Sequence, residues 1–341
     1  MFCLASAGAA WAGPVVREAS GPTAASIQAA VDRFRADLGP NNGVVPGSQP
    51  GGRREINWDG GGAAAAPTFD GPVLTRFVPR GARIVTFGTG FETSGAPSAE
   101  FDDINPSYSA QFAPFSPPRL FIATGTNVLD VLFNVPGNGT IAAGVTGFGA
   151  VFTDVDSDTS TRLQFFAPDG ALLFERFVPA AAGNETQSFL GVSFDSGEIV
   201  GRVRIVSGNA ALGPDETDAR DLVAMDDFIY GEPVSTAGVV ISPDSGAAFQ
   251  IGSFDLVIGV EAPPAPLTGG RVIFDGRDVT AGFAACFRPG TLRRGGSTFS
   301  CQVPRNLLSE GEHVVQVVVT FADNTSGRNA VRWTVLGASQ P

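Results

Sequence analysis

The chain has 341 residues, which suits two domains that each bury a hydrophobic core. Its 44 glycines and 25 prolines, with many Phe, Val and Thr residues, favour strands and turns over helices. The formal net charge is −12, and all of it lies before Thr236, because the residues from Thr236 onward contain eight acidic residues and eight arginines. An acidic surface repels nucleic acid and anionic lipid and attracts cations, so we expect no nucleic-acid partner.

Residues 1–12 are small and apolar, and Ala10, Trp11 and Ala12 fit the small-x-small pattern of a signal-peptide cleavage site. The basic segment of a complete signal is missing, so the pattern predicts a signal-peptide remnant. The alternative is a disordered alanine-rich terminus. We therefore expect a secreted protein, extracellular or periplasmic. No later run reaches the roughly 20 apolar residues of a membrane span, so we expect no transmembrane segment.

A helix is predicted over residues 24–38, with Thr23 as its N-cap and Gly39-Pro40 ending it. Four apolar residues recur at helical spacing within it: Ile27, Val31, Phe34 and Leu38. We expect this apolar side to pack across the end of a sheet.

From residue 73 the chain becomes a series of short segments in which apolar and polar residues alternate, as in Arg202 to Ile205. Turn-forming sequences separate these segments, for example Pro136-Gly137 and Pro168-Asp169-Gly170. This spacing is typical of an antiparallel sandwich or jelly roll. We predict an all-β chain in which residues 13–233, with one short N-terminal helix, form a jelly-roll domain.

The last predicted strand of this domain, residues 222–231, contains two adjacent carboxylates, Asp226 and Asp227. Successive side chains of a strand point to opposite faces, so one of the two should face inward or toward a sheet edge. A buried carboxylate is costly unless it is paired or coordinates a cation. The strand therefore predicts either a cation site or carboxylates bonded to backbone amides, Arg53 or Arg54.

A second acidic group follows the predicted strand at residues 146–153. Asp154, Asp156 and Asp158 occupy every second position, which could place them on one side. Calcium binds six to eight oxygen ligands, usually several of them carboxylates. The spacing does not match an EF-hand loop, because its glycine and terminal glutamate are absent. The two interpretations are a calcium site and a solvated acidic turn.

Residues 233–236 are predicted to be a linker, and residues 237–337 a second module. About seven short strands in some 100 residues indicate an immunoglobulin-like sandwich, with Trp333 in its core. Cys286 and Cys301 lie in strand-like segments on either side of a turn region. In a secreted protein they predict a disulfide, and the alternative is two buried free thiols.

Several motifs together resemble a largely uncharacterised family of secreted bacterial jelly-roll proteins: residues 52–60, 79–81, 87–91, 147–156 and 225–231. Residues 188–194 and the Asp226-Asp227 strand are also similar to PEP-CTERM-associated surface proteins and carbohydrate-binding modules. Residues 307–319 resemble the penultimate strands of bacterial Ig-like domains. The resemblance to carbohydrate-binding modules implies a structural calcium held by Glu92 together with Asp226 and Asp227.

Sugar-binding surfaces normally present exposed aromatic rings. Tyr108, in a predicted loop, and Trp58 are the candidates for binding polysaccharide or cell-surface glycans, although a tryptophan such as Trp58 is more often a core residue than a ligand platform. The chain has one histidine, His313, predicted to be a surface or strand-end residue, and it has no lysine. Zinc sites, Schiff-base chemistry and a Ser-His-Asp triad therefore have little support.

These patterns leave three hypotheses in order. The first is a secreted or cell-surface structural and interaction protein without catalytic activity, stabilised by a structural calcium. The second is a calcium-dependent carbohydrate-binding module on an Ig-like spacer. The third is a glycoside-processing enzyme that uses a pair of carboxylates.

Overall fold

The computed structural model describes residues 14–60, 66–95, 100–217, 219–236, 239–242, 247–250, 255–260, 267–283, 297–303, 309–322 and 326–336. The expected signal-peptide remnant lies outside these ranges, and so does Cys286. The backbone of Cys301 is described but its side chain is not, so the predicted disulfide falls outside the described residues.

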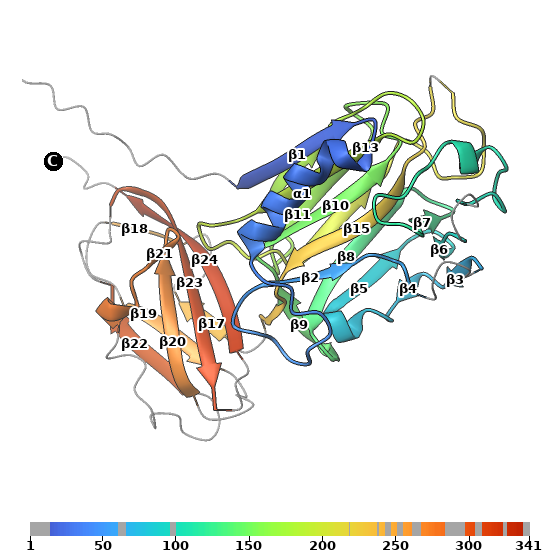
Figure 1. The fold of residues 1–341 in the computed structure, drawn as a ribbon. Coiled ribbons are helices and arrows are strands. Elements are labelled where there is room, and N and C mark those ends of the chain that lie inside the picture. The colour runs from blue at the N-terminus through green and yellow to red at the C-terminus, as the bar shows by residue number, and fades with distance from the viewer. Residues whose placement is uncertain are drawn as a thin grey trace, which may run out of the picture.

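Eight strands form a jelly roll of two antiparallel sheets (Figure 1). Their bounds are β7 Phe121–Thr124, β8 Val128–Val135, β10 Gly147–Thr153, β11 Arg162–Phe166, β12 Leu172–Phe177, β13 Gln187–Ser193, β14 Arg202–Val206 and β15 Ala224–Gly231. The first sheet has the order β7-β15-β10-β13, and the second has the order β8-β14-β11-β12. This interleaving of consecutive strands between two sheets is that of a jelly roll, as the sequence predicted.

Further strands extend both sheets. The first sheet gains β1 (Val15–Gly21) beside β13, β2 (Arg53–Ile56) beside β15, and β6 (Gly90–Thr93) and β3 (Thr68–Asp70) beyond β7. The second gains β5 (Ala82–Thr86) and β4 (Val73–Leu74) beyond β8, while β9 (Asn138–Gly144) pairs with the end of β8. Short 3-10 helices occur at Val78–Arg80 and Tyr108–Ala110. The strand β1 was not expected, because its sequence lacks a regular alternation of apolar residues.

The main core lies between the two sheets and is rich in aromatic rings. Trp58 stacks on Phe121 with ring centroids 3.6 Å apart, and Phe228 meets Trp58 edge-on at 5.1 Å. Stacked and edge-to-face pairs are the favourable geometries for such rings. Trp58 also donates its indole N–H to the Asp226 carbonyl at 2.9 Å, so its one polar atom is satisfied inside the core.

The helix α1 (Ala24–Leu38) has the predicted bounds, but it lies on the outer face of the first sheet and not across its end (Figure 1). Its buried residues Ile27, Val31, Phe34 and Leu38 pack with Val151, Phe189 and Ile229 of the sheet. Gly149 and Gly191 make room for Phe34, because a Cβ atom at either position would come within 2.8 Å of the Phe34 ring. No helix among the described residues is long and apolar enough to cross a membrane.

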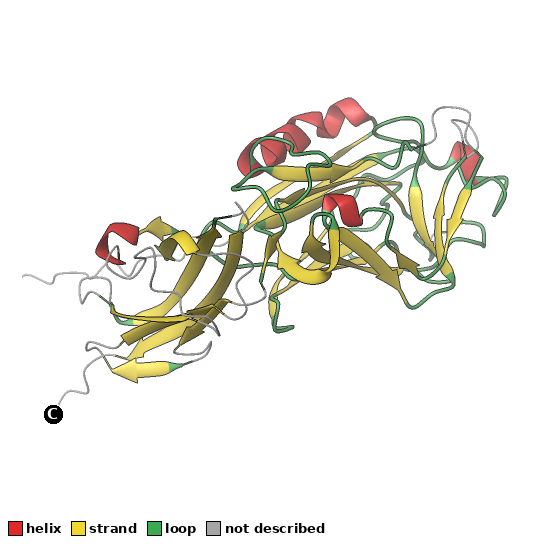
Figure 2. Cartoon of the chain, turned by 90° about the horizontal axis from the view of Figure 1, so that it is seen from below, coloured by secondary structure: helices red, strands yellow, loops and turns green. Residues whose placement is uncertain are grey.

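The second module is a two-sheet sandwich (Figure 2). Its own core includes Trp333, Val315 and Val317. One sheet has the order β17-β19-β22, and the other has the order β18-β24-β23-β20-β21. The bounds are β17 Val239–Ser242, β18 Ala248–Gln250, β19 Asp255–Val260, β20 Leu267–Phe274, β21 Arg277–Asp278, β22 Ser297–Gln302, β23 Gly311–Phe321 and β24 Ser326–Leu336, with a 3-10 helix at Thr280–Phe283. A three-stranded sheet facing a larger one is the arrangement of an immunoglobulin-like sandwich.

A two-residue strand, β16 (Val234–Ser235), lies within the predicted linker. Ser235 pairs with Ala143 of β9 on one side and with Gly327 of β24 on the other. One continuous sheet therefore runs from the jelly roll into the second module.

Candidate metal centre

Asp226 and Asp227 lie at a β-bulge. The register of β10 and β15 pairs Ala150 with Phe228 but Phe152 with Met225, so β15 has one residue more than β10 over this stretch. The extra residue breaks the strict alternation of side chains. Both carboxylates consequently lie on the same side, where each contacts the Ser116 hydroxyl. The prediction that one of the two faces inward or toward a sheet edge assumed strict alternation, which the bulge breaks, and both side chains are buried.

Asp226 is completely buried, and burial, followed by the charge of Asp227, raises its pKa well above the ordinary value. The Ser116 amide donates to Asp226 Oδ2 at 2.8 Å. The Ser116 hydroxyl has one proton and lies closer to Asp227 Oδ1, at 2.7 Å, than to Asp226 Oδ1, at 3.2 Å. The geometry thus fits a protonated Asp226 that donates to the hydroxyl, which in turn donates to an ionised Asp227.

The charge of Asp227 is matched by helix α1. Arg35 donates to Asp227 Oδ2 and to Glu55 Oε2, both at 2.9 Å, and Arg53 holds the other oxygen of Glu55 at 2.6 Å. The alternative to a cation site was a pair of carboxylates bonded to backbone amides or to Arg53 or Arg54. The structure shows such bonds, but the arginine that binds Asp227 is Arg35. Arg54 instead forms a fully buried ion pair with Glu232.

Glu92 occupies a separate place in β6. It is buried, its Oε1 atom has no hydrogen-bond partner among the described residues, and burial, followed by the neighbouring Asp103, raises its pKa to about 8. Among the described residues, Glu92 does not join Asp226 and Asp227 in a set of three carboxylates close enough to share an ion. The structure thus does not assemble the calcium site that the resemblance implied.

A different set of carboxylates does come together. The ligand oxygens of Asp154, Asp156 and Glu216 all lie within 4.8 Å of one another. The two aspartates follow β10, and Glu216 comes from the segment between β14 and β15. Asp158, the third member of the predicted trio, is not in this set, and its carboxylate accepts the Ala180 amide at 3.1 Å.

Sequence reasoning missed Glu216, because it lies some sixty positions beyond Asp154 and outside any regular strand. The acidic run from Asp215 to Asp218 was the one local signal. Tyr108 supports this segment: its hydroxyl accepts the Gly213 amide and donates to the Pro214 carbonyl, both at 2.8 Å.

The three carboxylates have few protein donors. Gln111 donates to Asp154 Oδ2 at 2.7 Å and to Glu216 Oε2 at 2.8 Å, the Leu222 amide donates to Glu216, and the Gly183 amide donates to Asp156. Asp154 Oδ1 is buried and receives no hydrogen bond from a donor among the described residues, while a hydrogen bond between the Asp154 and Glu216 carboxyls helps to raise the pKa of Asp154. An unpaired buried carboxylate oxygen beside two other carboxylates is costly unless a proton or a cation joins them.

Electrostatics lead to the same conclusion. Burial first, and then the charge of Glu216, raises the pKa of Asp154 to about 9, and burial also raises the pKa of Glu216. The donor set consists of carboxylate oxygens, with no nitrogen or sulfur ligand, which suits a hard divalent cation such as Ca²⁺. Asp156 is exposed, so the set is open to solvent on that side.

Asp221 holds the adjacent turn in place. Its carboxylate accepts the amides of Asp156 and Ser157, at 3.3 and 3.2 Å, and the hydroxyl of Ser160. These bonds fix the backbone that presents Asp156, so we assign Asp221 a supporting role in the centre.

The expected sugar-binding rings are not at the surface. Trp58 lies in the main core and Tyr108 is buried in a smaller cluster with Phe101 and Phe112. Neither ring presents a face to solvent, because the aromatic side chains around them fill that space. His313 is also buried, against the expectation of a surface position, although it does lie near the start of β23.

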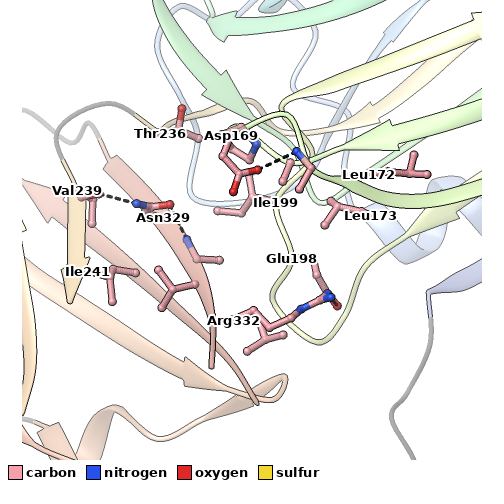
Figure 3. A pocket seen from close by; sticks show the side chains of 16 residues that line it. Asp169, Leu172, Leu173, Glu198, Ile199, Thr236, Val239, Ile241, Asn329 and Arg332 are labelled. Carbon is pink, nitrogen blue, oxygen red and sulfur yellow. Dashed lines mark hydrogen bonds and ion pairs between the residues drawn. The ribbon is translucent and has the colours of Figure 1, made fainter. Parts of the chain in front are cut away.

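A cavity of about 530 Å³ lies between the two modules (Figure 3). Leu172 and Leu173 line one side, and Val239 and Ile241 line the other. Its polar groups largely bond to one another or to backbone: Glu198 lies 3.7 Å from Arg332, and Asn329 donates to the Val239 carbonyl at 2.7 Å.

No family model matches the chain, and no curated protein matches it. Among solved structures, it is similar to fibronectin(III)-like modules of Clostridium thermocellum CbhA, with 14% identity, a TM-score of 0.21, and coverage of 30% of this chain and 99% of that one. It is also similar to a β-1,2-glucanase from Parabacteroides distasonis, with 10% identity, a TM-score of 0.22, and coverage of 88% of this chain and 39% of that one. The similarity to the Streptococcus pyogenes Epf adhesin domain has 6% identity, a TM-score of 0.18, and coverage of 87% of this chain and 97% of that one. Likenesses this weak indicate neither a family nor an activity.

Proposed function

We propose that this chain is a secreted or cell-surface interaction protein without catalytic activity, whose jelly roll is stabilised by a structural calcium at Asp154, Asp156 and Glu216. The observation that carries the proposal is the buried, unpartnered Asp154 Oδ1 atom within 4.8 Å of two other carboxylates. A cation there would neutralise the cluster and replace the proton that Asp154 otherwise holds.

The cation would join two distant parts of the jelly roll. Asp154 and Asp156 extend from β10, whereas Glu216 belongs to the segment between β14 and β15. That segment contains many turn residues and no strand of the sandwich, so it is held by turn and side-chain hydrogen bonds, such as those of Tyr108, and not by a sheet. Calcium sites in extracellular modules bind at about 10⁻⁴–10⁻³ M, which fits a secreted protein.

A structural role fits the cluster better than a catalytic one. A carboxylic acid with a pKa near 9 beside a carboxylate resembles the pair of a glycoside hydrolase. However, Asp154 is completely buried, and a general acid must reach the atom to which it delivers its proton. The glycoside-processing hypothesis therefore remains third.

The test is thermal unfolding of the chain in calcium and in EDTA, together with metal analysis. A ligand at one hundred times its Kd stabilises the folded state by about 2.7 kcal/mol, so a clear rise in Tm is expected with calcium. Glu216→Gln should abolish that rise. Asp158→Asn, a matched acidic neighbour outside the cluster, should keep it. Equal melting in calcium and EDTA, with no metal bound, would contradict the proposal.

A further inference from the structure

The two sheets of the jelly roll differ in what covers their outer faces. Helix α1 packs on the first sheet, whereas the second sheet carries arginines on its outer side. Val203 and Ile205 of β14 point into the core, so Arg202 and Arg204 point outward. By register Arg162 and Arg83 lie on the same side, and we call these four arginines with Phe166 and Phe177 the arginine face.

The arginine face is positive in a chain of net charge −12. Two acidic residues lie on the same side of these strands. Asp130 accepts both Arg204, at 2.7 Å, and Arg202, at 3.2 Å, and Glu175 lies 3.7 Å from Arg162. Four guanidinium groups against two carboxylates leave two positive charges. The Nε atoms of Arg83 and Arg162 are buried and have no hydrogen-bond partner among the described residues.

Aromatic and aliphatic groups accompany these charges. The Arg202 guanidinium lies 3.7 Å from the centre of the Phe166 ring, and Arg162 lies 5.8 Å from Phe177. Phe87, directly after the end of β5, is 86% exposed, and Leu172, which pairs with Phe166, is 56% exposed. Exposed apolar groups gathered on one face typically mark an interaction surface.

We propose that the arginine face binds an anionic polysaccharide. Planar guanidinium groups bind carboxylate or sulfate groups through paired hydrogen bonds, and aromatic rings pack against the apolar faces of sugar rings. From β12 to β5 the face spans four inter-strand steps of about 4.8 Å, or about 19 Å, which suits an extended chain. Its charges are spread along the strands, whereas protein partners are usually held by a central, fully desolvated cluster. The inference rests on the proposed binding function but uses none of the residues of the metal centre.

The test measures binding of the full chain to polygalacturonate by affinity electrophoresis, in EDTA and low salt, with neutral dextran, poly-glutamate and single-stranded DNA as comparisons. We expect retardation by polygalacturonate that weakens as salt rises, and none by dextran. The double variant Arg83→Gln, Arg162→Gln should weaken binding at least tenfold. It leaves the ion pairs of Asp130 with Arg202 and Arg204 in place, so the folded sheet should be preserved. The matched double variant Arg33→Gln, Arg277→Gln removes two exposed charges elsewhere and should bind like the unchanged chain.

Several results would overturn the inference: no binding to polygalacturonate, equal binding to dextran, equal binding to poly-glutamate or DNA, or equal weakening by both double variants. Glu216→Gln separates this inference from the proposed metal centre, because it should remove the calcium effect on Tm and leave polygalacturonate binding in EDTA unchanged.

Discussion

Asp226 and Asp227 are neighbours in the chain, and both contact the hydroxyl of Ser116, at 3.2 and 2.7 Å. A bulge in β15 places them on one side of the sheet, and burial raises the pKa of both carboxyls, that of Asp226 well above its ordinary value. With Arg35 facing Asp227 alone, the geometry favours the proton on Asp226 and the charge on Asp227.

This difference predicts unequal effects of the same substitution. Asp226→Asn should change the free energy of unfolding little at neutral pH, because an amide replaces a neutral acid of the same shape. Asp227→Asn removes the charge that Arg35 faces and should cost about 1–3 kcal/mol. Urea unfolding of both variants measures this. A larger loss for Asp226→Asn would show that its carboxyl is ionised.

Stability without calcium should depend on pH through Asp154. Its pKa rises from 3.8 in the unfolded chain to about 9 in the fold, so the folded state holds a proton that the unfolded chain releases. Its contribution is therefore present below about pH 4 and declines as pH rises toward 9. In EDTA, Asp154→Asn should flatten the fall in stability between pH 5 and 9, as measured by urea unfolding. If the variant showed the same dependence of stability on pH as the unchanged chain, the proton would not reside on Asp154.

The ion pair of Arg54 and Glu232 is fully buried, with N–O distances of 2.7 and 2.9 Å. Removing one partner leaves the other charge buried, so Glu232→Gln should lower the free energy of unfolding by about 3–5 kcal/mol. Asp37→Asn, which breaks the exposed pair with Arg17, is the control and should lower the free energy of unfolding far less, because solvent screens that pair. Comparable losses in the two variants would contradict this difference.

His313 should titrate above its ordinary pKa of 6.5. Its ring nitrogens lie 2.7 Å from Asp275 Oδ2 and 2.9 Å from the Ser309 carbonyl, and both partners are acceptors that favour the protonated ring. The protonated ring therefore contributes to the free energy of unfolding in full below pH 6.5, and this contribution is lost as the pH rises through the pKa of His313 in the folded state. NMR can follow this titration directly, because the chain has one histidine. Asp275→Asn should lower the measured pKa, and an unchanged value would exclude Asp275 as the cause.

The parts of the fold that depend on local pattern could be predicted. The bounds of α1 follow from the spacing of Ile27, Val31, Phe34 and Leu38 and from Gly39, and the strands of both modules follow from alternation and turn residues. The side of the sheet that α1 covers depends instead on Gly149 and Gly191, whose role appears only when Phe34 is placed against them.

The candidate site was predicted only in part. Asp154 and Asp156 lie close in sequence, so their pattern was visible, whereas Glu216 joins them through the return of a distant segment. The side chains of Asp226 and Asp227 do not alternate, because β15 has a bulge at this point. A bulge depends on how two strands pair, so the sequence of one strand does not predict it. Trp58 and Tyr108 are buried by tertiary packing, which composition does not reveal.

The strand β16 has a mechanical consequence. Because Ser235 is bonded to β9 on one side and to β24 on the other, tension applied along β24 is passed sideways into the jelly roll through hydrogen bonds as well as along the covalent chain. Under load, these hydrogen bonds would have to break before the two modules could separate. The junction should therefore resist stretching more than a flexible linker would.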